Sequence, residues 1–495
     1  MTALRRTPAL RRLLVAALAL VVGVLGLTLT GVISATGESF PAATPRAKCG
    51  PGAKPETGIQ GRVPRADYTS GRVEKGYRCN TRLVSAQGST GGFKVLRYRD
   101  SKGHTCAFYD STLLFPKDVL FNAAKGLGVV VLDMSNPTSP RKVTTLTSPA
   151  MQSPHESVLL NKRRGLLGAV LGNPATAVGI LDLYDVRTDC RRPKLLSSTN
   201  APVLGHESGW SPDGRTYYAS STGGNTFVAI DVTNPREPKR IFQQNGVNYH
   251  GLRVSDDGRT LYVANIGNSS SPQFSSGGLR ILDVSEIQER QANPKVRVLS
   301  NLSWPEHSIP QVAEPFTKKG RHYLLEVDEF ANFGLTGGPT QSAAPVGAAR
   351  IIDIEDPKHP KVVSNLRLAV HQPGARAGNQ QNDPGATVPV QGYAGHYCSV
   401  PKRRNPRIVG CSMILSGLRL FDISSLKHPR EVGYFNEPTV AGSKPRNPTA
   451  EGGFAMSQPA WDIARRTVWY SDGNAGFFAV KLTNGVGKLL RKHRR

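Results

Sequence analysis

Histidines recur along most of the chain, and their type and spacing suit metal chemistry. Six of the 11 histidines follow this spacing: His104, His155, His206, His250, His307 and His396. Two of them are followed by glutamate and serine, in the strings His155-Glu156-Ser157 and His206-Glu207-Ser208. Neutral imidazole is a common ligand of zinc, copper and iron, and a glutamate can bind the metal or orient a ligand. These residues form a metal site only if the fold brings them together.

The elements that would position these histidines belong to a sequence repeat. Its clearest copy is GLRILDV at Gly278–Val284, and close copies are GVVVLDM at Gly128–Met134, FVAIDV at Phe227–Val232, ARIIDI at Ala349–Ile354 and GLRLFDI at Gly417–Ile423. Weaker copies are GILDLYDV at Gly179–Val186 and GFFAVKL at Gly476–Leu482. A second shared phrase follows four of these copies, usually with a Pro-x-x-Pro spacing, as in SNPTSPRKV at Ser135–Val143.

Each repeat predicts a small antiparallel sheet. An apolar run of this length, rich in Val, Ile and Leu, is too short for a helix and is typical of a buried strand. The Asp at its end can accept hydrogen bonds from the following turn, so Asp133, Asp231, Asp283, Asp353 and Asp422 are predicted to be turn residues. Asp-Gly pairs within Trp210–Ala219 and Val254–Val263 predict hairpins. The sequence therefore predicts an all-β, seven-bladed β-propeller of four-stranded antiparallel blades.

A propeller would place the histidines near one axis, because the first strand of each blade lines the central channel. The predicted metal-site residues are His155, His206, His250 and His307, supported by Glu156, Glu207 and Glu326, with His104 and His396 lining the channel. The expected metal is zinc, copper or iron. The alternative is a packing role, in which each histidine caps the channel by a hydrogen bond to the backbone of the neighbouring blade. A repeat would copy such a packing residue as readily as a ligand.

The amino terminus predicts export. Residues 1–35 join a basic segment to the apolar stretch Leu13–Ile33, which is typical of a signal peptide or a signal-anchor helix. Residues 36–92, rich in Pro, Gly, Thr and charge, predict a disordered linker and an irregular lead-in. The rest of the chain is expected to be extracellular or at the cell surface, either released or anchored to the cytoplasmic membrane.

Residues 93–482 are predicted to form the propeller, followed by a basic tail at residues 483–495. The last repeat ends near Leu482 without an outer strand, whereas Phe93–Tyr98 gives a lone strand ahead of the first blade. We therefore expect Phe93–Tyr98 to become the outer strand of the last blade and to close the ring, which would remove an exposed edge. Two insertions, Phe330–Val346 and Val370–Tyr393, are predicted to be surface loops.

The strings LRILDVS, VVVLDMS and LRLFDIS, with the Asn-Pro-x-x-Pro phrases, resemble the LVIVD repeat. This repeat occurs in secreted bacterial and archaeal proteins for which β-propeller folds are predicted. The resemblance covers roughly residues 104–482 and implies the fold, but it implies no activity. The histidine arrangement is also similar in outline to the axial sites of some metal-containing propeller oxidases, although no catalytic motif of those enzymes is present.

The six cysteines predict disulfides in an exported protein. They are Cys49, Cys79, Cys106, Cys190, Cys398 and Cys411. Cys398 and Cys411 are expected to pair, because they would lie on adjacent antiparallel strands of one blade. The other four would form two bridges that tie the lead-in to the first blades, with the pairing left open.

The chain is strongly basic, with 63 Lys and Arg against 36 Asp and Glu and a formal charge of +27. This charge favours anionic polymers of the cell envelope, although an arginine-rich solvated surface would give the same composition. Specific nucleic-acid binding is not expected, because no nucleic-acid-binding motif accompanies the charge. Phosphate-binding loops and hydrolase motifs are also missing from the sequence.

Three functions remain open. The first is a monomeric binding scaffold, secreted or on the cell surface, for an unknown protein or an anionic envelope polymer. The second is a metal-dependent enzyme, an oxidase or a hydrolase, that uses the channel histidines. The third is a structural envelope protein held by its amino-terminal helix.

Overall fold

The repeated apolar run forms the third strand of every blade in the computed structural model. Its copies are β5 (Val129–Asp133), β9 (Leu181–Asp185), β13 (Thr226–Asp231), β17 (Gly278–Asp283), β21 (Ala349–Asp353), β25 (Leu418–Asp422) and β29 (Gly476–Leu482). All residues of β5 and β25 are buried. A strand buried on both faces is apolar throughout instead of alternating, because sheets pack against both of its sides.

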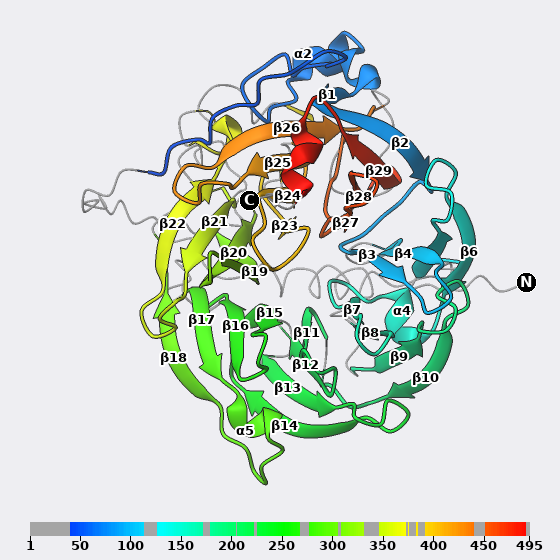
Figure 1. Ribbon diagram of the computed structural model, residues 1–495, viewed down its shortest axis with the longest axis vertical. Coiled ribbons are helices and arrows are strands. Elements are labelled where there is room, and N and C mark those ends of the chain that lie inside the picture. Colours follow the sequence, from blue (N-terminus) through cyan, green and yellow to red (C-terminus); the bar gives the residue numbers. More distant parts are fainter. Residues whose placement is uncertain are drawn as a thin grey trace, which may run out of the picture.

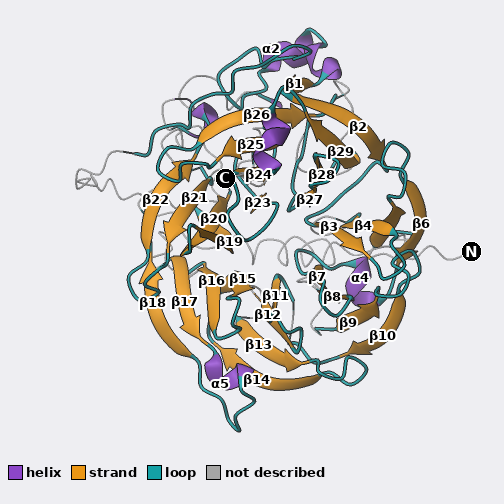
Figure 2. Cartoon of the chain, in the orientation of Figure 1, coloured by secondary structure: helices purple, strands orange, loops and turns teal. Residues whose placement is uncertain are grey.

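The structure describes residues 40–112, 126–171, 179–203, 205–221, 225–267, 277–304, 308–330, 346–372, 375, 383–384, 392–439 and 451–491. Within these ranges seven antiparallel sheets stand around a common axis (Figure 1; Figure 2). The innermost strands are β3 (Val95–Arg99), β7 (Leu159–Asn161), β11 (Ser208–Trp210), β15 (Tyr249–Val254), β19 (Ile309–Lys318), β23 (Tyr397–Ser399) and β27 (Ala460–Asp462). The second strands are β4 (Thr105–Asp110), β8 (Leu166–Val170), β12 (Thr216–Ser221), β16 (Thr260–Asn265), β20 (Arg321–Glu329), β24 (Ile408–Ser412) and β28 (Thr467–Asp472). The predicted seven-bladed propeller is confirmed.

The outermost strands are more polar than the third strands that they cover. They are β6 (Arg141–Leu146), β10 (Lys194–Thr199), β14 (Lys239–Asn245), β18 (Arg297–Leu302), β22 (Lys361–Leu366), β26 (Arg430–Asn436) and β2 (Thr81–Gln87). Every one of them has a register shift against its third strand. The predicted Asp turns are also present, since Asp133 accepts a hydrogen bond from the amide of Ser135 at 2.9 Å and Asp283 from that of Ser285 at 2.9 Å.

The strand that closes the ring is not the predicted one. Phe93–Tyr98 was expected to complete the last blade, but β3, which contains most of it, is the innermost strand of the first blade and pairs with β4. The last blade is completed by β2, which pairs with β29. The physical reason is the strand count of the first blade: Thr105–Asp110 is its second strand and pairs with β3 as the inner strand, so the preceding segment Thr81–Gln87 is left to pair with β29.

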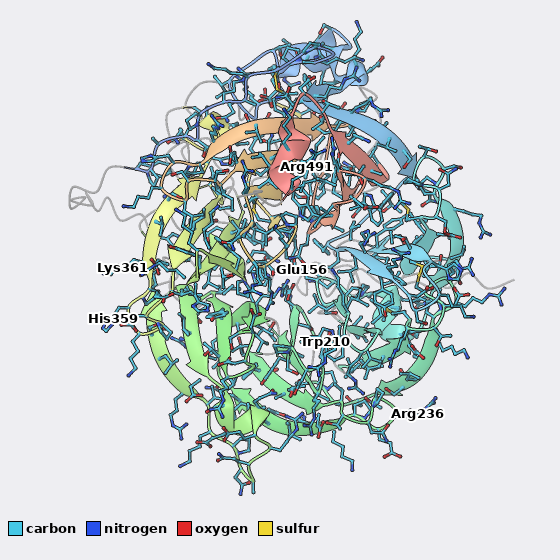
Figure 3. All side chains as sticks on the ribbon, in the orientation of Figure 1. Glu156, Trp210, Arg236, His359, Lys361 and Arg491 are labelled. Carbon is cyan, nitrogen blue, oxygen red and sulfur yellow. A yellow bond between two sulfur atoms is a disulfide. The ribbon has the colours of Figure 1, made fainter. Side chains whose placement is uncertain are left out.

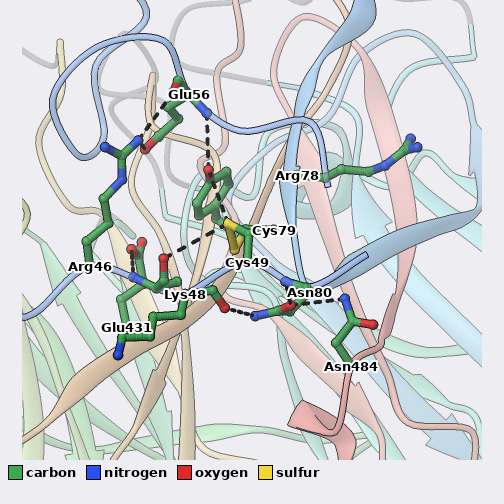
Figure 4. The surroundings of a disulfide bond; sticks show 12 residues. Arg46, Lys48, Cys49, Glu56, Arg78, Cys79, Asn80, Glu431 and Asn484 are labelled. Atoms are coloured by element: carbon green, nitrogen blue, oxygen red, sulfur yellow. Dashed lines mark hydrogen bonds and ion pairs between the residues drawn. A yellow bond between two sulfur atoms is a disulfide. The ribbon is translucent and has the colours of Figure 1, made fainter. Parts of the chain in front are cut away.

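The lead-in is more ordered than predicted. It contains α2 (Arg65–Thr69), a 3-10 helix η1 (Arg72–Lys75) and β1 (Tyr77–Cys79), which adds a fifth strand to the sixth blade beside β26. The disulfide Cys49–Cys79 holds this segment (Figure 4). The remaining short helices are α4 (Pro149–Gln152), α5 (Ser285–Gln288), η3 (Ala369–His371) and η6 (Val486–Leu490), the last within the predicted tail.

The cysteines form three disulfides. The predicted Cys398–Cys411 bridge is confirmed and joins β23 to β24. Cys106–Cys190 links the first two blades, while Cys49–Cys79 stays within the lead-in. The expectation that both remaining bridges connect the lead-in to the first blades was therefore wrong.

Several predictions concern residues that the structure does not describe. The signal or anchor segment 1–35 and most of the two insertions lie outside the described residues. Among the residues that are described, no helix is long and apolar enough to cross a membrane.

Ring closure by β2 predicts a position-specific stability effect. Leu83 packs against the apolar cluster that contains Leu420 and Val480. Leu83→Asp would place a carboxylate in this contact and should lower the free energy of unfolding by about 2–3 kcal/mol. Ala86→Asp adds the same charge at an exposed position of the same strand and should change it by less than about 0.5 kcal/mol. Denaturant unfolding of both variants measures the difference, and equal effects would contradict closure through β2.

Candidate metal centre in the central channel

Four inner strands bring four histidines to one end of the channel. His155 precedes β7, His206 precedes β11, His250 lies in β15 and His396 precedes β23. Because the inner strands begin at the same end of the ring, these residues meet. The ring centroids of His155 and His206 are 4.1 Å apart, and those of His206 and His250 are 4.6 Å apart. Figure 3 shows Glu156 near the middle of the ring of blades.

Two carboxylates lie among the imidazoles. Oε2 of Glu156 lies 3.4 Å from Nε2 of His206 and 3.3 Å from Nε2 of His250. The other oxygen of Glu156, Oε1, lies 3.1 Å from Nε2 of His396. Glu329, the last residue of β20, places Oε1 3.6 Å from Nε2 of His250 and Oε2 3.2 Å from Nε2 of His396. Both carboxylates thus approach the Nε2 side of the rings.

Backbone carbonyls of the next blades orient two of the rings. Nδ1 of His250 lies 2.8 Å from the carbonyl oxygen of Pro310, and Nδ1 of His396 lies 2.6 Å from that of Met456. A carbonyl oxygen only accepts hydrogen bonds, so Nδ1 carries the hydrogen in both rings. In the neutral ring Nε2 then presents its lone pair to the cluster. Metal-binding histidines are commonly fixed by this kind of hydrogen bond.

Several polar atoms of the cluster are buried without a hydrogen bond. His155 is 7% exposed and Glu156 is 2% exposed. Among the described residues, no group forms a well-aligned hydrogen bond with either ring nitrogen of His155, with Oε2 of Glu156 or with Nε2 of His396. His206 is the most open member, because 19% of its side chain remains exposed. Buried polar atoms usually have a partner, so a water molecule or another ligand is expected beside these atoms.

An uncommon backbone conformation directs Glu156 into the cluster. His155 has φ = 51°, in the left-handed region that residues other than glycine rarely adopt. The corner is held by hydrogen bonds from the amide of Glu156 to the carbonyl of His206 at 3.2 Å and from the amide of Ser157 to the carbonyl of Pro154 at 3.0 Å. Conformations of this kind persist where the surrounding structure enforces them, often at functional sites.

Burial and the neighbouring charges shift the pKa values of the cluster residues. Burial, followed by the nearby His206, lowers the pKa of His155 well below its usual value, which favours the neutral ring. Burial opposes a charge on Glu156, but its contacts with the histidines prevail and hold the pKa of its carboxyl well below the usual range. Burial likewise opposes a charge on His396, yet Glu156 and Glu329 raise its pKa to about 9. A metal ion bound here would displace the proton of His396, because ligands bind in their deprotonated form.

A second polar layer lies further along the inner strands, where Glu207 and Tyr397 directly follow His206 and His396. Lys94 forms an ion pair with Glu207, and its Nζ lies 3.7 Å from the ring centroid of Tyr397. Arg253 contacts Glu207 at 3.0 Å and also pairs with Glu314. The hydroxyl of Tyr397 donates to Glu207 at 3.1 Å. Two cations face two carboxylates, so this layer balances its own charge.

Two of the predicted supporting acids lie elsewhere. Glu207 belongs to the layer around Lys94 and Arg253, not to the histidine cluster. Glu326 is buried within the fifth blade, where it forms an ion pair with Arg350. The acid that does reach the histidines from this strand is Glu329, three residues after Glu326. Sequence reasoning missed it, although an acid at the end of a second strand would lie at the same end of the ring as the histidines.

Two predicted histidines do not join the cluster. His104 lies between β3 and β4, at the opposite end of its inner strand, and its Nδ1 lies 2.9 Å from Asp100 and 3.7 Å from Asp189. The prediction that it lines the channel was wrong because it precedes a second strand, not a first one. His307 lies outside the described residues. His396, predicted only to line the channel, is instead a central member of the cluster.

Comparisons with known proteins give one family match and several distant structural similarities. The family model of the LVIVD repeat matches residues 121–147. The β-propeller domain of Cps50 (Swd1) from Myceliophteria thermophila is 12% identical, with 81% of this chain and 98% of that chain covered and a TM-score of 0.49. Hydrazine synthase from Kuenenia stuttgartiensis is 13% identical, with 81% of this chain and 97% of that chain covered and a TM-score of 0.48. Such distant similarities carry no functional information.

No curated protein matches the sequence. The repeat match and the seven closed blades are therefore the findings that classify the molecule. The chain is a seven-bladed β-propeller that carries the LVIVD repeat.

Proposed function

We propose that this protein is an exported metalloenzyme that binds a first-row transition metal in the mouth of its propeller channel. The observation that carries the proposal is the convergence of four histidines and two glutamates from different blades, with ring nitrogens and a carboxylate oxygen that are buried without hydrogen bonds. Imidazole and carboxylate ligands suit zinc, copper and iron. The ligands we assign are His155, His206, His250 and His396, with Glu156 and Glu329.

A packing role explains only part of this geometry. His250 and His396 do bond the backbone of the next blade, as a packing residue would. That bond uses Nδ1 alone, so Nε2 of His396 is left facing the carboxylates without a hydrogen bond, while Nε2 of His250 lies 2.8 Å from Nε2 of His206. Packing also gives no reason for His155, a buried imidazole for which neither nitrogen has a hydrogen bond among the described residues. A metal ion would give a partner both to the unbonded Nε2 of His396 and to the unbonded ring of His155.

The site suits catalysis better than structural support. The ring is already closed by β2, and three disulfides stabilise the described chain, so the fold does not depend on a metal for closure. His206 remains partly exposed, so one of the proposed ligands borders the solvent. A bound metal would supply Lewis-acid activation of water, or electron transfer where it is iron or copper. These are the chemistries of a hydrolase and of an oxidase.

Export is the second element of the proposal. Three disulfides suit an oxidising compartment, and the apolar segment at residues 13–33 is typical of an export signal. The formal charge of +27 favours a location near anionic envelope polymers. A scaffold that binds such polymers without catalysis is the competing function, and it requires no metal.

The metal content of the purified protein tests the proposal. Elemental analysis of protein exported from a native-like host should find at least one transition metal ion per chain. His250→Ala and His396→Ala should each lower the metal affinity by at least about tenfold, because each removes a ligand. Removal of the metal should abolish oxygen uptake or ester hydrolysis, and its return should restore the activity.

Two histidine variants serve as matched controls. His359 lies on the outer rim, where 74% of its side chain is exposed, and His104 lies away from the cluster (Figure 3 labels His359). His359→Ala and His104→Ala should keep the full metal content. A protein that is free of metal, and whose His250→Ala variant is merely less stable, would reject the metalloenzyme and favour the scaffold.

The second polar layer predicts a separation of stability from metal binding. Glu207→Gln leaves Lys94 and Arg253 buried with one carboxylate less, and should lower the free energy of unfolding by about 3–5 kcal/mol. The metal content of the folded protein should stay unchanged. Lys94→Met in the same background should recover part of the stability, which a double-mutant cycle by denaturant unfolding measures. Loss of metal without loss of stability in Glu207→Gln would contradict the placement of Glu207.

A further inference from the structure

The two oxygens of Glu156 face different sets of ligands. Oε2 is directed to His206 and His250, at 3.4 and 3.3 Å from their Nε2 atoms. Oε1 is directed to His396, at 3.1 Å from its Nε2. If Glu156 bound only one ion, nothing would require its second oxygen to contact a different histidine. The geometry of Glu156 is that of a bridge.

The donor atoms accordingly form two sets that share Glu156. In the first set, donor atoms of His155, Glu156 and His206 lie within 4.8 Å of one another. In the second set, the same holds for Glu156, Glu329 and His396. His250 lies nearer the first set, because its Nε2 is 2.8 Å from Nε2 of His206 and 3.6 Å from Oε1 of Glu329.

The spacings within each set match those of ligands around one ion. Two atoms bound at about 2.1 Å lie about 3.0 Å apart at an octahedral angle and about 3.4 Å apart at a tetrahedral angle. In the first set, His206, His250 and Oε2 of Glu156 are separated by 2.8, 3.3 and 3.4 Å. In the second set, Nε2 of His396 lies 3.1 Å from Oε1 of Glu156 and 3.2 Å from Oε2 of Glu329. These atoms are therefore spaced as ligands of one ion would be, whereas His155 is farther away, with its Nδ1 3.9 Å from Oε2 of Glu156.

We propose that the channel holds two divalent transition metal ions bridged by the carboxylate of Glu156. His155, His206, His250 and Oε2 of Glu156 bind the first ion; the second is bound by His396, Glu329 and Oε1 of Glu156. This inference rests on the proposed metal site and adds its nuclearity. The second ion keeps positions open for water or substrate, because the protein supplies only three ligands. Two ions held by a shared carboxylate can act on one substrate together.

Metal stoichiometry and magnetic coupling test the bridge. Demetallated protein is loaded with excess Cu²⁺ or Mn²⁺, desalted and measured by elemental analysis and electron paramagnetic resonance. The wild type should hold two ions per chain, with a spectrum altered by coupling between them. Glu329→Gln should keep one ion with an uncoupled spectrum, since it removes a ligand of the second ion only. His359→Ala should keep both ions and their coupling.

Each outcome decides between the two proposals. One ion per chain in the wild type, or loss of both ions in Glu329→Gln, would overturn the bridged pair and leave a single-metal site standing. Two ions with an uncoupled wild-type spectrum would also overturn the bridge. No bound ion at all would reject the metal site itself. The wild-type spectrum needs no variant, so the test holds even where Glu329→Gln fails to fold.

Discussion

Face-to-face packing of seven sheets around one axis is the constraint on which the rest of the structure depends. Each sheet is covered on both sides, so its third strand is apolar along its length, as in β5 and β25. The same packing forces the inner strands together and removes water from the side chains between them. Polar groups in the channel are then stable only when they bind one another or a ligand.

The two polar layers of the channel meet this constraint in different ways. Lys94, Arg253, Glu207 and Glu314 form a set of ion pairs with equal numbers of positive and negative charges. The histidine cluster leaves buried nitrogens without hydrogen bonds and holds its carboxylates against imidazole nitrogens. The charges of the first layer are balanced by its own side chains, so this layer can pack the channel without a ligand. In the proposed function, metal cations complete the second layer.

Features that repeat from blade to blade could be predicted from the sequence. Features that depend on the exact position of one residue on one strand could not. The apolar strands, the Asp turns and the meeting of several histidines follow from a motif that recurs in most blades. Cys398–Cys411 follows from one hairpin. The closing strand β2 lies outside the repeat and looks like any polar segment. Glu329 differs from Glu326 only by its place on β20, and three positions along a strand decide which acid meets the histidines.

The string His-Glu-Ser shows why equal motifs diverge. In the third blade Glu207 follows His206 and enters the ion-pair layer, while in the second blade Glu156 follows His155 and enters the histidine cluster. The difference lies in the backbone, since His155 has a left-handed φ of 51° and His206 is not among the described residues with a positive φ. That turn redirects the following side chain. An uncommon backbone conformation at one repeat position thus brings Glu156, and not a residue of the ion-pair layer, between the two sets of histidines.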